Sequence, residues 1–191
     1  MIILGVDPGS LTTGYGVVDF RGSSYRLLAC DVVRNSADAA MPIRLKSIYE
    51  RLVAVIRKFK PDAMAIESAF YGKNVQSTLK IGYVRGVSLL AAVQCGIPTV
   101  EYSPREVKRA IAGNGAASKE RVQFMVKSIL GLNELPKPLD ISDALAVALC
   151  HSHYVAPFAK KSRAHAHLKR AAGQSWSQFI LNHPERIARS R

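Results

Sequence analysis

Apolar residues occur in short runs over the first third of the chain and at helical spacing after it. Runs rich in Val, Leu, Ile, Tyr and Gly predict strands over residues 2–7, 14–20 and 25–33, each bounded by Gly, Pro or Ser. Three consecutive strands with short links are typical of an antiparallel meander. The first run ends on an acidic residue, Asp7, directly before the turn Pro8-Gly9.

Apolar positions three and four residues apart predict the helices. Pro42 opens the first helix, and its apolar face consists of Leu45, Ile48, Tyr49, Leu52, Ile56 and Phe59. We expect a strand over 62–67, a helix over 75–94, a strand over 99–102, a basic helix over 103–111, a helix capped by Ser118 and ended by Gly131, and a last helix over about 141–154. The order βββαβαβααα predicts a single α/β mixed sheet flanked by helices.

The helix over 75–94 is apolar on more than one side and contains Gly82 and Gly86. We expect one side to cover the sheet and the other to pair with a second copy of the chain, because a helix that is apolar all round is normally buried. A wholly internal helix is the alternative.

The net charge adds a first indication of function. The 191 residues include 27 Lys or Arg against 14 Asp or Glu, a net of +13, and such a surface attracts polyanions such as nucleic acid. Residues 155–191 hold eight of the basic residues and only one acid, so about half of the excess belongs to the C-terminal end. We predict a domain over 1–155 and a basic tail over 156–191 that is mobile unless bound, with a short helix possible over 174–181.

Cys30, Cys95 and Cys150 are widely spaced among apolar neighbours, which favours reduced core thiols in a cytoplasmic protein. We expect no signal peptide, because Asp7 interrupts the first apolar run and no basic region precedes that run, and the longest apolar stretches are too short to span a bilayer. We therefore expect no membrane partner.

Four carboxylates stand at the ends of predicted elements. Asp7 and Glu67 each end a strand, while Asp140 and Asp143 lie three apart at the start of the last helix and can share one face. In open α/β sheets, sites form at the carboxyl ends of strands, so these groups can converge. Magnesium prefers oxygen ligands, and two such ions can support phosphodiester hydrolysis.

Each of these acids also has a purely structural interpretation. Asp140 can be an N-cap with Asp143 at the third helical position, Glu67 an ion-pair partner, and Asp7 an Asx-turn residue. Asp7 is the hardest to explain in this way, since an acid directly after five apolar residues needs compensation.

Basic and aromatic residues lie in the same part of the chain. Arg105, Lys108 and Arg109 lie on one side of the short helix, and Lys119, Gln123 and Lys127 form a polar stripe on the next, near the amides of the loop 113–115. A solvated helix face is the alternative. In a loop after Glu67, Phe70 can stack on bases or anchor the loop in the core. We expect His151 and His153 only to interact favourably with the helix dipole at the C-terminal end of the last helix.

An ordered set of motifs runs through about residues 1–155. It consists of Gly5-Val6-Asp7-Pro8-Gly9-Ser10, Thr13-Gly14-Tyr15-Gly16, Ile66-Glu67, Phe70, Lys73-Asn74, Arg85-Gly86, Val107-Lys108, Gly113-Asn114-Gly115, Ser118-Lys119 and Asp140-Ile141-Ser142-Asp143-Ala144-Leu145-Ala146. Taken in this order, the set resembles the bacterial Holliday-junction resolvase family RuvC.

The resemblance implies an RNase H-like fold and a homodimer that nicks four-way DNA junctions symmetrically in recombination and repair. It implies two Mg²⁺ ions per subunit, bound by Asp7, Glu67, Asp140 and Asp143, and work alongside RuvA and RuvB. It also implies DNA contacts by Phe70 as a wedge, by Lys73, Lys108 and Lys119, and we add Arg105 and Arg109 to this set from their position.

Three other functions remain open at this point. The run Asp7-Pro8-Gly9-Ser10 also resembles the first phosphate loop of actin-like ATPases and sugar kinases, although those enzymes need two copies of the fold and one copy is present here. A non-catalytic nucleic-acid-binding scaffold would leave the four carboxylates without a purpose. An RNase H-like nuclease that acts on RNA is not excluded by composition.

Overall fold

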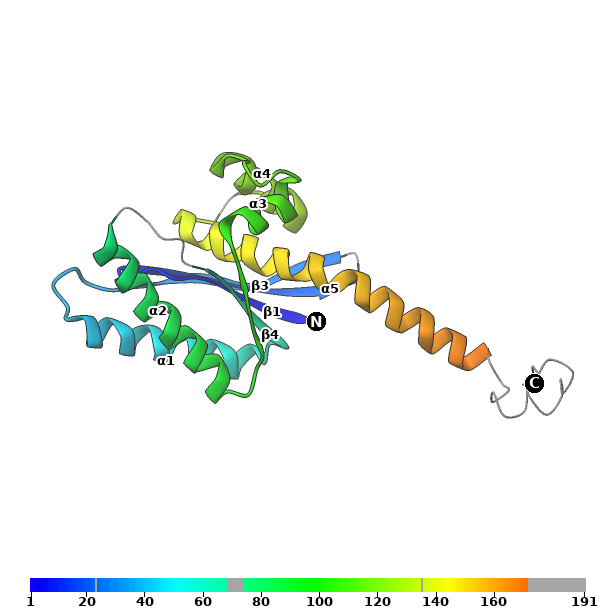
Figure 1. The fold of residues 1–191 in the computed structure, drawn as a ribbon, viewed down its shortest axis with the longest axis horizontal. Helices are drawn as coiled ribbons and strands as arrows, with labels where there is room; N and C mark the ends of the chain where they lie inside the picture. The colour runs from blue at the N-terminus through cyan, green and yellow to red at the C-terminus, as the bar shows by residue number, and fades with distance from the viewer. Residues whose placement is uncertain (23, 69–73, 135, 172–191) are drawn as a thin grey trace, which may run out of the picture. The chain divides into compact units, whose positions relative to one another are not determined.

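The computed structural model describes residues 1–22, 24–68, 74–134 and 136–171 (Figure 1). The chain divides into two units, Met1–Tyr154 and Val155–Arg191, each of which is described by itself. The first unit contains a mixed sheet of five strands in the order β3-β2-β1-β4-β5.

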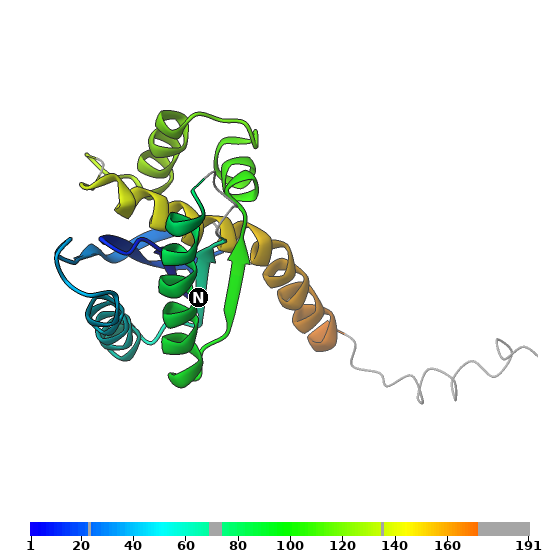
Figure 2. The ribbon, with the colours of Figure 1, turned by 60° about the vertical axis from the view of Figure 1, so that its left-hand side comes forward.

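The first three strands form the predicted meander. β1 (Ile2–Asp7) pairs antiparallel with β2 (Thr12–Arg21), which pairs antiparallel with β3 (Ser24–Arg34). On its other side, β1 pairs in parallel with β4 (Ala63–Glu67), and β4 pairs in parallel with β5 (Thr99–Tyr102). Parallel neighbours need a crossover, which α1 (Met41–Phe59) and α2 (Val75–Gln94) supply (Figure 2). The α/β class and the mixed sheet are confirmed.

One face of the sheet packs on α1 and α2, as Figure 1 shows. Alternate residues of β1 and β4 point to this face, and they form a core with the apolar face of α1 that the spacing predicted. The fully buried members of that core include Leu4, Val6, Met64, Ile66, Ile48 and Leu52. The burial of each of these six side chains contributes about 2 kcal/mol to the packing of α1 on the sheet.

The other face packs on α5 (Leu139–Ala171), and glycine permits a very close approach there. A Cβ built on Gly5 would lie 2.0 Å from the Ala144 carbonyl oxygen, and one on Gly14 would lie 2.1 Å from that of Asp140. Because no side chain intervenes, the first turns of α5 rest directly on the backbone of β1 and β2. The helices α3 (Pro104–Ala112) and α4 (Lys119–Leu130) lie on this same side (Figure 1).

α5 is longer than the sequence predicted. It begins at Leu139 and continues through Pro157 to Ala171, whereas we expected its end near Tyr154. Proline removes one backbone hydrogen bond and commonly ends a helix, but the residues that follow are mostly Ala, Lys, Arg and Leu, which are strong helix formers. Their propensity extends the helix without an apolar stripe, so apolar periodicity did not detect it. Residues 174–181 lie outside the described part of the chain.

α2 is buried on one side only. Val84, Ser88, Ala91 and Ala92 are buried. The opposite side exposes five large apolar side chains, namely Val75, Leu79, Tyr83, Leu90 and Val93. The alternative of a wholly internal helix is therefore wrong. We call this exposed side the α2 apolar face.

Two further expectations concern cysteines and membranes. Cys150 is buried, whereas Cys30 and Cys95 are only partly so, and all three thiols are free. Within the described ranges, no helix is long and apolar enough to cross a membrane.

Candidate active site

Asp7 and Glu67 lie side by side because β1 and β4 are parallel neighbours. Gly5 is in register with Ala65, and Asp7 and Glu67 each follow two residues later. Side chains alternate between the two faces of a strand, so both carboxylates point to the face that carries α5 rather than to the core under α1. The prediction that strand ends bring these two acids together is thus matched by the register.

α5 brings Asp140 and Asp143 to the same place. Gly14 is the register partner of Asp7 across β1 and β2, and the backbone of Asp140 rests directly on Gly14. Asp140 lies in the first turn of α5, which begins one residue earlier at Leu139, so the N-cap interpretation of Asp140 is wrong. Asp143 follows three residues later, in the next turn.

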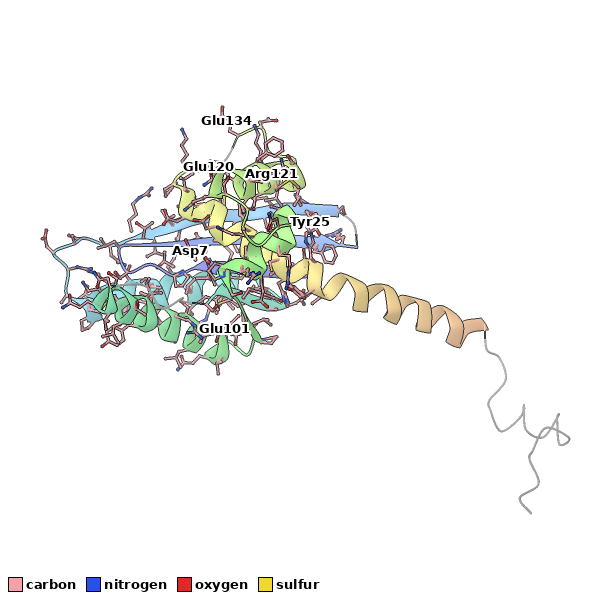
Figure 3. All side chains as sticks on the ribbon, turned by 45° about the horizontal axis from the view of Figure 1, so that its top comes forward. Asp7, Tyr25, Glu101, Glu120, Arg121 and Glu134 are labelled. Atoms are coloured by element: carbon pink, nitrogen blue, oxygen red, sulfur yellow. The ribbon has the colours of Figure 1, made fainter. Side chains whose placement is uncertain are left out.

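A cavity of about 280 Å³ opens at this point between α5, α3 and α4. Glu67 and Asp143 line it on the acidic side, and Lys108 and Lys119 line it on the basic side. Its apolar wall consists of Pro104, Val107, Val122 and Ala146. Figure 3 shows Asp7 on the sheet and Glu120, the neighbour of Lys119, on α4. A cavity with both carboxylates and ammonium groups can hold a phosphate together with its counter-ions.

The crowded carboxylates hold their protons unusually strongly. Burial, followed by the nearby charges of Glu67, Asp143 and Asp140, raises the pKa of Asp7 from 3.8 to about 8, although Lys119 opposes the shift. Burial also raises the pKa of Glu67, with Asp143 as the next cause. A strongly raised carboxyl pKa among several acids in a cleft is typical of a functional site.

Lys119 partly neutralises this cluster. Its Nζ lies 2.7 Å from Oδ2 of Asp143, and this bond is the main reason that the pKa of Lys119 is raised. Lys119 is the first residue of α4, directly after Ser118, whose hydroxyl accepts the amide hydrogen of Arg121. The helix start therefore directs the ammonium group toward the acids.

The donor set suits a hard divalent cation. Carboxylates are the oxygen ligands that Mg²⁺ prefers, and the pKa of Asp7 is raised first by burial and then by the other three acids. Among the residues that the structure describes, no three such side chains yet converge on one point, and Asp143 is engaged by Lys119.

The other predicted residues fall into three groups. Lys108 lines the cavity, while Arg105 and Arg109 are exposed on α3 and do not line it. Phe70 and Lys73 lie outside the described residues. We predicted that Gln123 forms an exposed polar stripe with Lys119 and Lys127, but only 8% of Gln123 is exposed, and it is buried together with Val122. Helical spacing alone did not show which side of α4 faces α5.

Sequence reasoning missed a buried polar contact behind the site. A hydrogen bond of 2.8 Å joins the Tyr102 hydroxyl to Nδ1 of His151. His153 donates from Nδ1 to the carbonyl of Ala110, which lies in the last turn of α3. Neither histidine is near the end of α5, so the expectation of a helix-end role is wrong. The sequence signal for this contact was the position of His151 among the apolar residues of a helix, which is typical of a buried, hydrogen-bonded histidine.

Comparison with known proteins decides the family. A sequence model described as crossover junction endodeoxyribonuclease RuvC matches residues 3–151. The chain belongs to the RuvC family. A RuvC from Desulforamulus reducens is 46% identical over 158 residues, which cover 83% of this chain and 97% of the relative. One from Chlorobium phaeovibrioides is 45% identical over 190 residues, covering 98% and 100%.

Solved RuvC structures agree with this assignment. The Thermus thermophilus RuvC structure is 40% identical with a TM-score of 0.77, covering 81% of this chain and 95% of that one. The same organism's RuvC in complex with a Holliday junction substrate is 38% identical with a TM-score of 0.75, over the same shares. A yeast mitochondrial Holliday junction resolvase, 14% identical with a TM-score of 0.57, shares the fold.

Membership of the RuvC family makes this chain an enzyme, a DNA endonuclease that resolves four-way junctions. The RNase H-like fold that the resemblance implied is confirmed. The ATPase, the non-catalytic scaffold and the RNA-directed nuclease are set aside. The RuvC family is one of metal-dependent nucleases.

Proposed function

We propose that Asp7, Glu67, Asp140 and Asp143 hold two Mg²⁺ ions with which this RuvC chain hydrolyses one phosphodiester in each of two strands of a four-way junction. The packing of the first turns of α5 against two adjacent strand ends, which brings the four acids into one region, supports this proposal more than any other observation. Bound Mg²⁺ supplies Lewis acidity and lowers the pKa of a water to make it a nucleophile.

The residues around the acids have roles of their own. Lys108 and Lys119 line the cavity, where their charges bind the scissile phosphate and offset the charge that develops on it. As a ligand of the ion, Asp143 would give up its ion pair with Lys119, whose ammonium group would then be free to hold the phosphate. Glu67 and Asp7 stay in place because β1 and β4 are held rigidly by the sheet.

The DNA-contacting surface extends beyond the cavity. Arg105 and Arg109 on α3 are exposed and available to neighbouring phosphates. From the resemblance, Phe70 acts as a wedge between bases and Lys73 as a further phosphate contact.

The α2 apolar face is the surface through which we propose that the chain forms a homodimer. Leu79, Tyr83, Leu90 and Val93 recur at helical spacing and are 50–65% exposed. A Cβ built on either Gly82 or Gly86 meets nothing within 4 Å, so the backbone here is open to a close neighbour. A two-fold dimer presents two identical sites, which suits symmetric nicking. By resemblance, the dimer acts in the cytoplasm alongside RuvA and RuvB.

A cleavage assay tests the metal site. The purified protein is incubated with a labelled four-way junction, a linear duplex and an RNA–DNA hybrid, each with Mg²⁺ or with EDTA. We expect cutting of the junction alone, and only with Mg²⁺. Asp7→Asn, Glu67→Gln, Asp140→Asn and Asp143→Asn should each slow cutting about 100-fold or more, the equivalent of about 3 kcal/mol of lost transition-state stabilisation, while junction binding is retained.

The control is Asp38→Asn, which removes an exposed carboxylate outside the site and should leave the rate unchanged. Cutting in EDTA at the normal rate would refute the metal requirement. A normal rate for any one of the four variants would remove that residue from the proposed set.

Sedimentation tests the dimer. Leu79→Glu with Leu90→Glu places two charges on the α2 apolar face and should give monomers. The matched control is Ile43→Glu, which charges an apolar side chain on α1 that is 61% exposed and should leave the dimer intact. Monomers that still cut both strands of one junction together would contradict the role of the dimer.

A further inference from the structure

The helical residues that follow the catalytic unit carry charge of a single sign. α5 continues from Val155 to Ala171, and we call residues 155–171 the basic arm. Its charged residues are Lys160, Lys161, Arg163, Lys169 and Arg170, with no Asp or Glu. Nothing in the carboxylate site or in the proposed dimer surface uses these charges. Like charges three or four residues apart on a helix repel one another, so the arm gains stability when a polyanion neutralises them.

Helical geometry arranges part of this charge into a line. At 3.6 residues per turn, Lys160, Arg163, His167 and Arg170 fall within an arc of roughly 80°. We call these four positions the basic stripe. Lys161 and Lys169 fall outside it, which provides an internal comparison. With a rise of about 1.5 Å per residue, the stripe is roughly 15 Å long and spans the rise of about four phosphates along one DNA strand.

The composition of the arm favours DNA over a lipid surface. A membrane-bound amphipathic helix needs a continuous apolar side opposite the basic one. Away from the stripe, the arm combines Phe158 and Leu168 with the charges of Lys161 and Lys169, so no such side exists. The substrate of the enzyme is itself a polyanion with four duplex arms, and it brings phosphate backbone to the protein whenever the enzyme acts.

The family comparison separates the arm from the shared catalytic chemistry. The RuvC sequence model ends at residue 151, before the arm begins. The Desulforamulus reducens relative aligns over 158 residues with 97% of its own length, whereas the Chlorobium phaeovibrioides relative matches 98% of this chain. Some members of the family thus share a counterpart of the arm and others end near the catalytic unit, which points to an added binding element.

We propose that the basic arm binds the phosphate backbone of a duplex arm of the junction through the basic stripe, and thereby adds sequence-independent affinity to the catalytic unit. The proposal rests on the chain acting on junction DNA but not on the carboxylate site. Each phosphate that the stripe neutralises releases counter-ions, so its contribution appears directly in the salt dependence of binding.

A salt titration tests this. A fluorescein-labelled four-way junction is bound in EDTA, so that no strand is cut, and the dissociation constant is measured by anisotropy from 50 to 300 mM KCl. For Lys160→Gln with Arg170→Gln, the slope of log K against log salt should fall by about 1.8, and binding at 0.1 M KCl should weaken about 60-fold. A linear duplex should lose the same factor, because phosphates carry no junction-specific information.

The matched control removes the same charge from the other positions of the same helix. Lys161→Gln with Lys169→Gln should change the slope by less than about 0.5. Glutamine is a good helix former, and circular dichroism should show equal helix content for both pairs. Equal slope changes for the two pairs would overturn the stripe in favour of diffuse charge. No change for either pair would overturn DNA binding by the arm and favour an acidic protein partner. Loss of junction preference over duplex would also contradict the proposal.

The catalytic site can fail independently of the arm. Asp7→Asn should stop cutting yet retain the full salt slope of the natural sequence. A reduced slope in the stripe variant would therefore stand even if the carboxylate assignment were wrong, and normal cutting by Asp7→Asn would leave the arm untouched.

Discussion

The buried charge of Asp7 should make the metal-free enzyme less stable as the pH rises. The carboxyl of Asp7 has a pKa of about 8 in the folded protein and 3.8 as its ordinary value, chiefly because of burial and then because of Glu67 and Asp143. Below pH 3.8 the carboxyl is protonated in both the folded and the unfolded chain, so it does not lower the free energy of unfolding. Above that value the unfolded chain releases the proton while the folded protein retains it, so stability falls until the pH passes about 8.

The magnitude follows from the two pKa values. Each unit of pKa shift corresponds to about 1.36 kcal/mol, so Asp7 costs about 1–2 kcal/mol at pH 5 and about 5 kcal/mol at pH 8. Asp7→Asn keeps the shape of the side chain and removes the charge. In EDTA, the variant should therefore be more stable than the natural sequence, and the difference should grow by about 4 kcal/mol between pH 5 and pH 8.

Urea unfolding followed by circular dichroism measures this difference at each pH. Asp38→Asn serves as the control, since it removes an exposed carboxylate and should shift neither curve. Added Mg²⁺ should stabilise the natural sequence at pH 8 far more than Asp7→Asn, because the ion compensates the charge that the variant lacks. A difference between the two proteins that is flat with pH in EDTA would refute the reasoning, since it would mean that Asp7 is not held protonated by its surroundings.

Three further changes test other parts of the site. Lys119→Met removes the 2.7 Å ion pair between Lys119 and Asp143. Mg²⁺ should then bind about tenfold more tightly, as measured by calorimetry, while junction cutting falls. An unchanged Mg²⁺ affinity would contradict the proposal that Lys119 and the ion compete for Asp143. Tyr102→Phe removes the buried hydrogen bond to His151 and should lower the free energy of unfolding by about 1–3 kcal/mol in urea titrations, whereas Tyr154→Phe should not. Gly14→Ala places a Cβ against the first turn of α5 and should reduce single-turnover cutting much more than junction binding. Equal losses of cutting and binding would refute the role of Gly14 in placing Asp140.

Most elements could be predicted because their signals are local. β1, α2 and β5 have the predicted bounds, and α4 lies between Ser118 and Gly131 as expected. Apolar runs, caps and Pro or Gly breaks act over a few residues, and each of these elements has them. The end of α5 was predicted wrongly because the residues after Pro157 are strong helix formers whose sequence has no apolar periodicity.

Orientation could not be predicted as well as position. Gln123 and Lys119 lie one helical turn apart on α4, yet the first is buried and the second reaches Asp143. The exposed apolar face of α2 and the buried contact of His151 likewise depend on which neighbours each helix meets. Spacing places residues on a common side of a helix, but only packing decides which side meets the sheet.

For the active site, the sequence by itself determined the chemistry and the tertiary structure decided the geometry. Four acids at the ends of predicted elements, within an ordered set of family motifs, already indicated metal-dependent cutting of junction DNA. The register of β1 and β4 then placed Asp7 and Glu67 on the same face. Gly14, which no chemical argument had singled out, lets α5 approach until Asp140 rests on the sheet. Burial and mutual repulsion arise from that register and that approach together, so the raised pKa of Asp7 and the ion pair of Lys119 are properties of the folded chain alone.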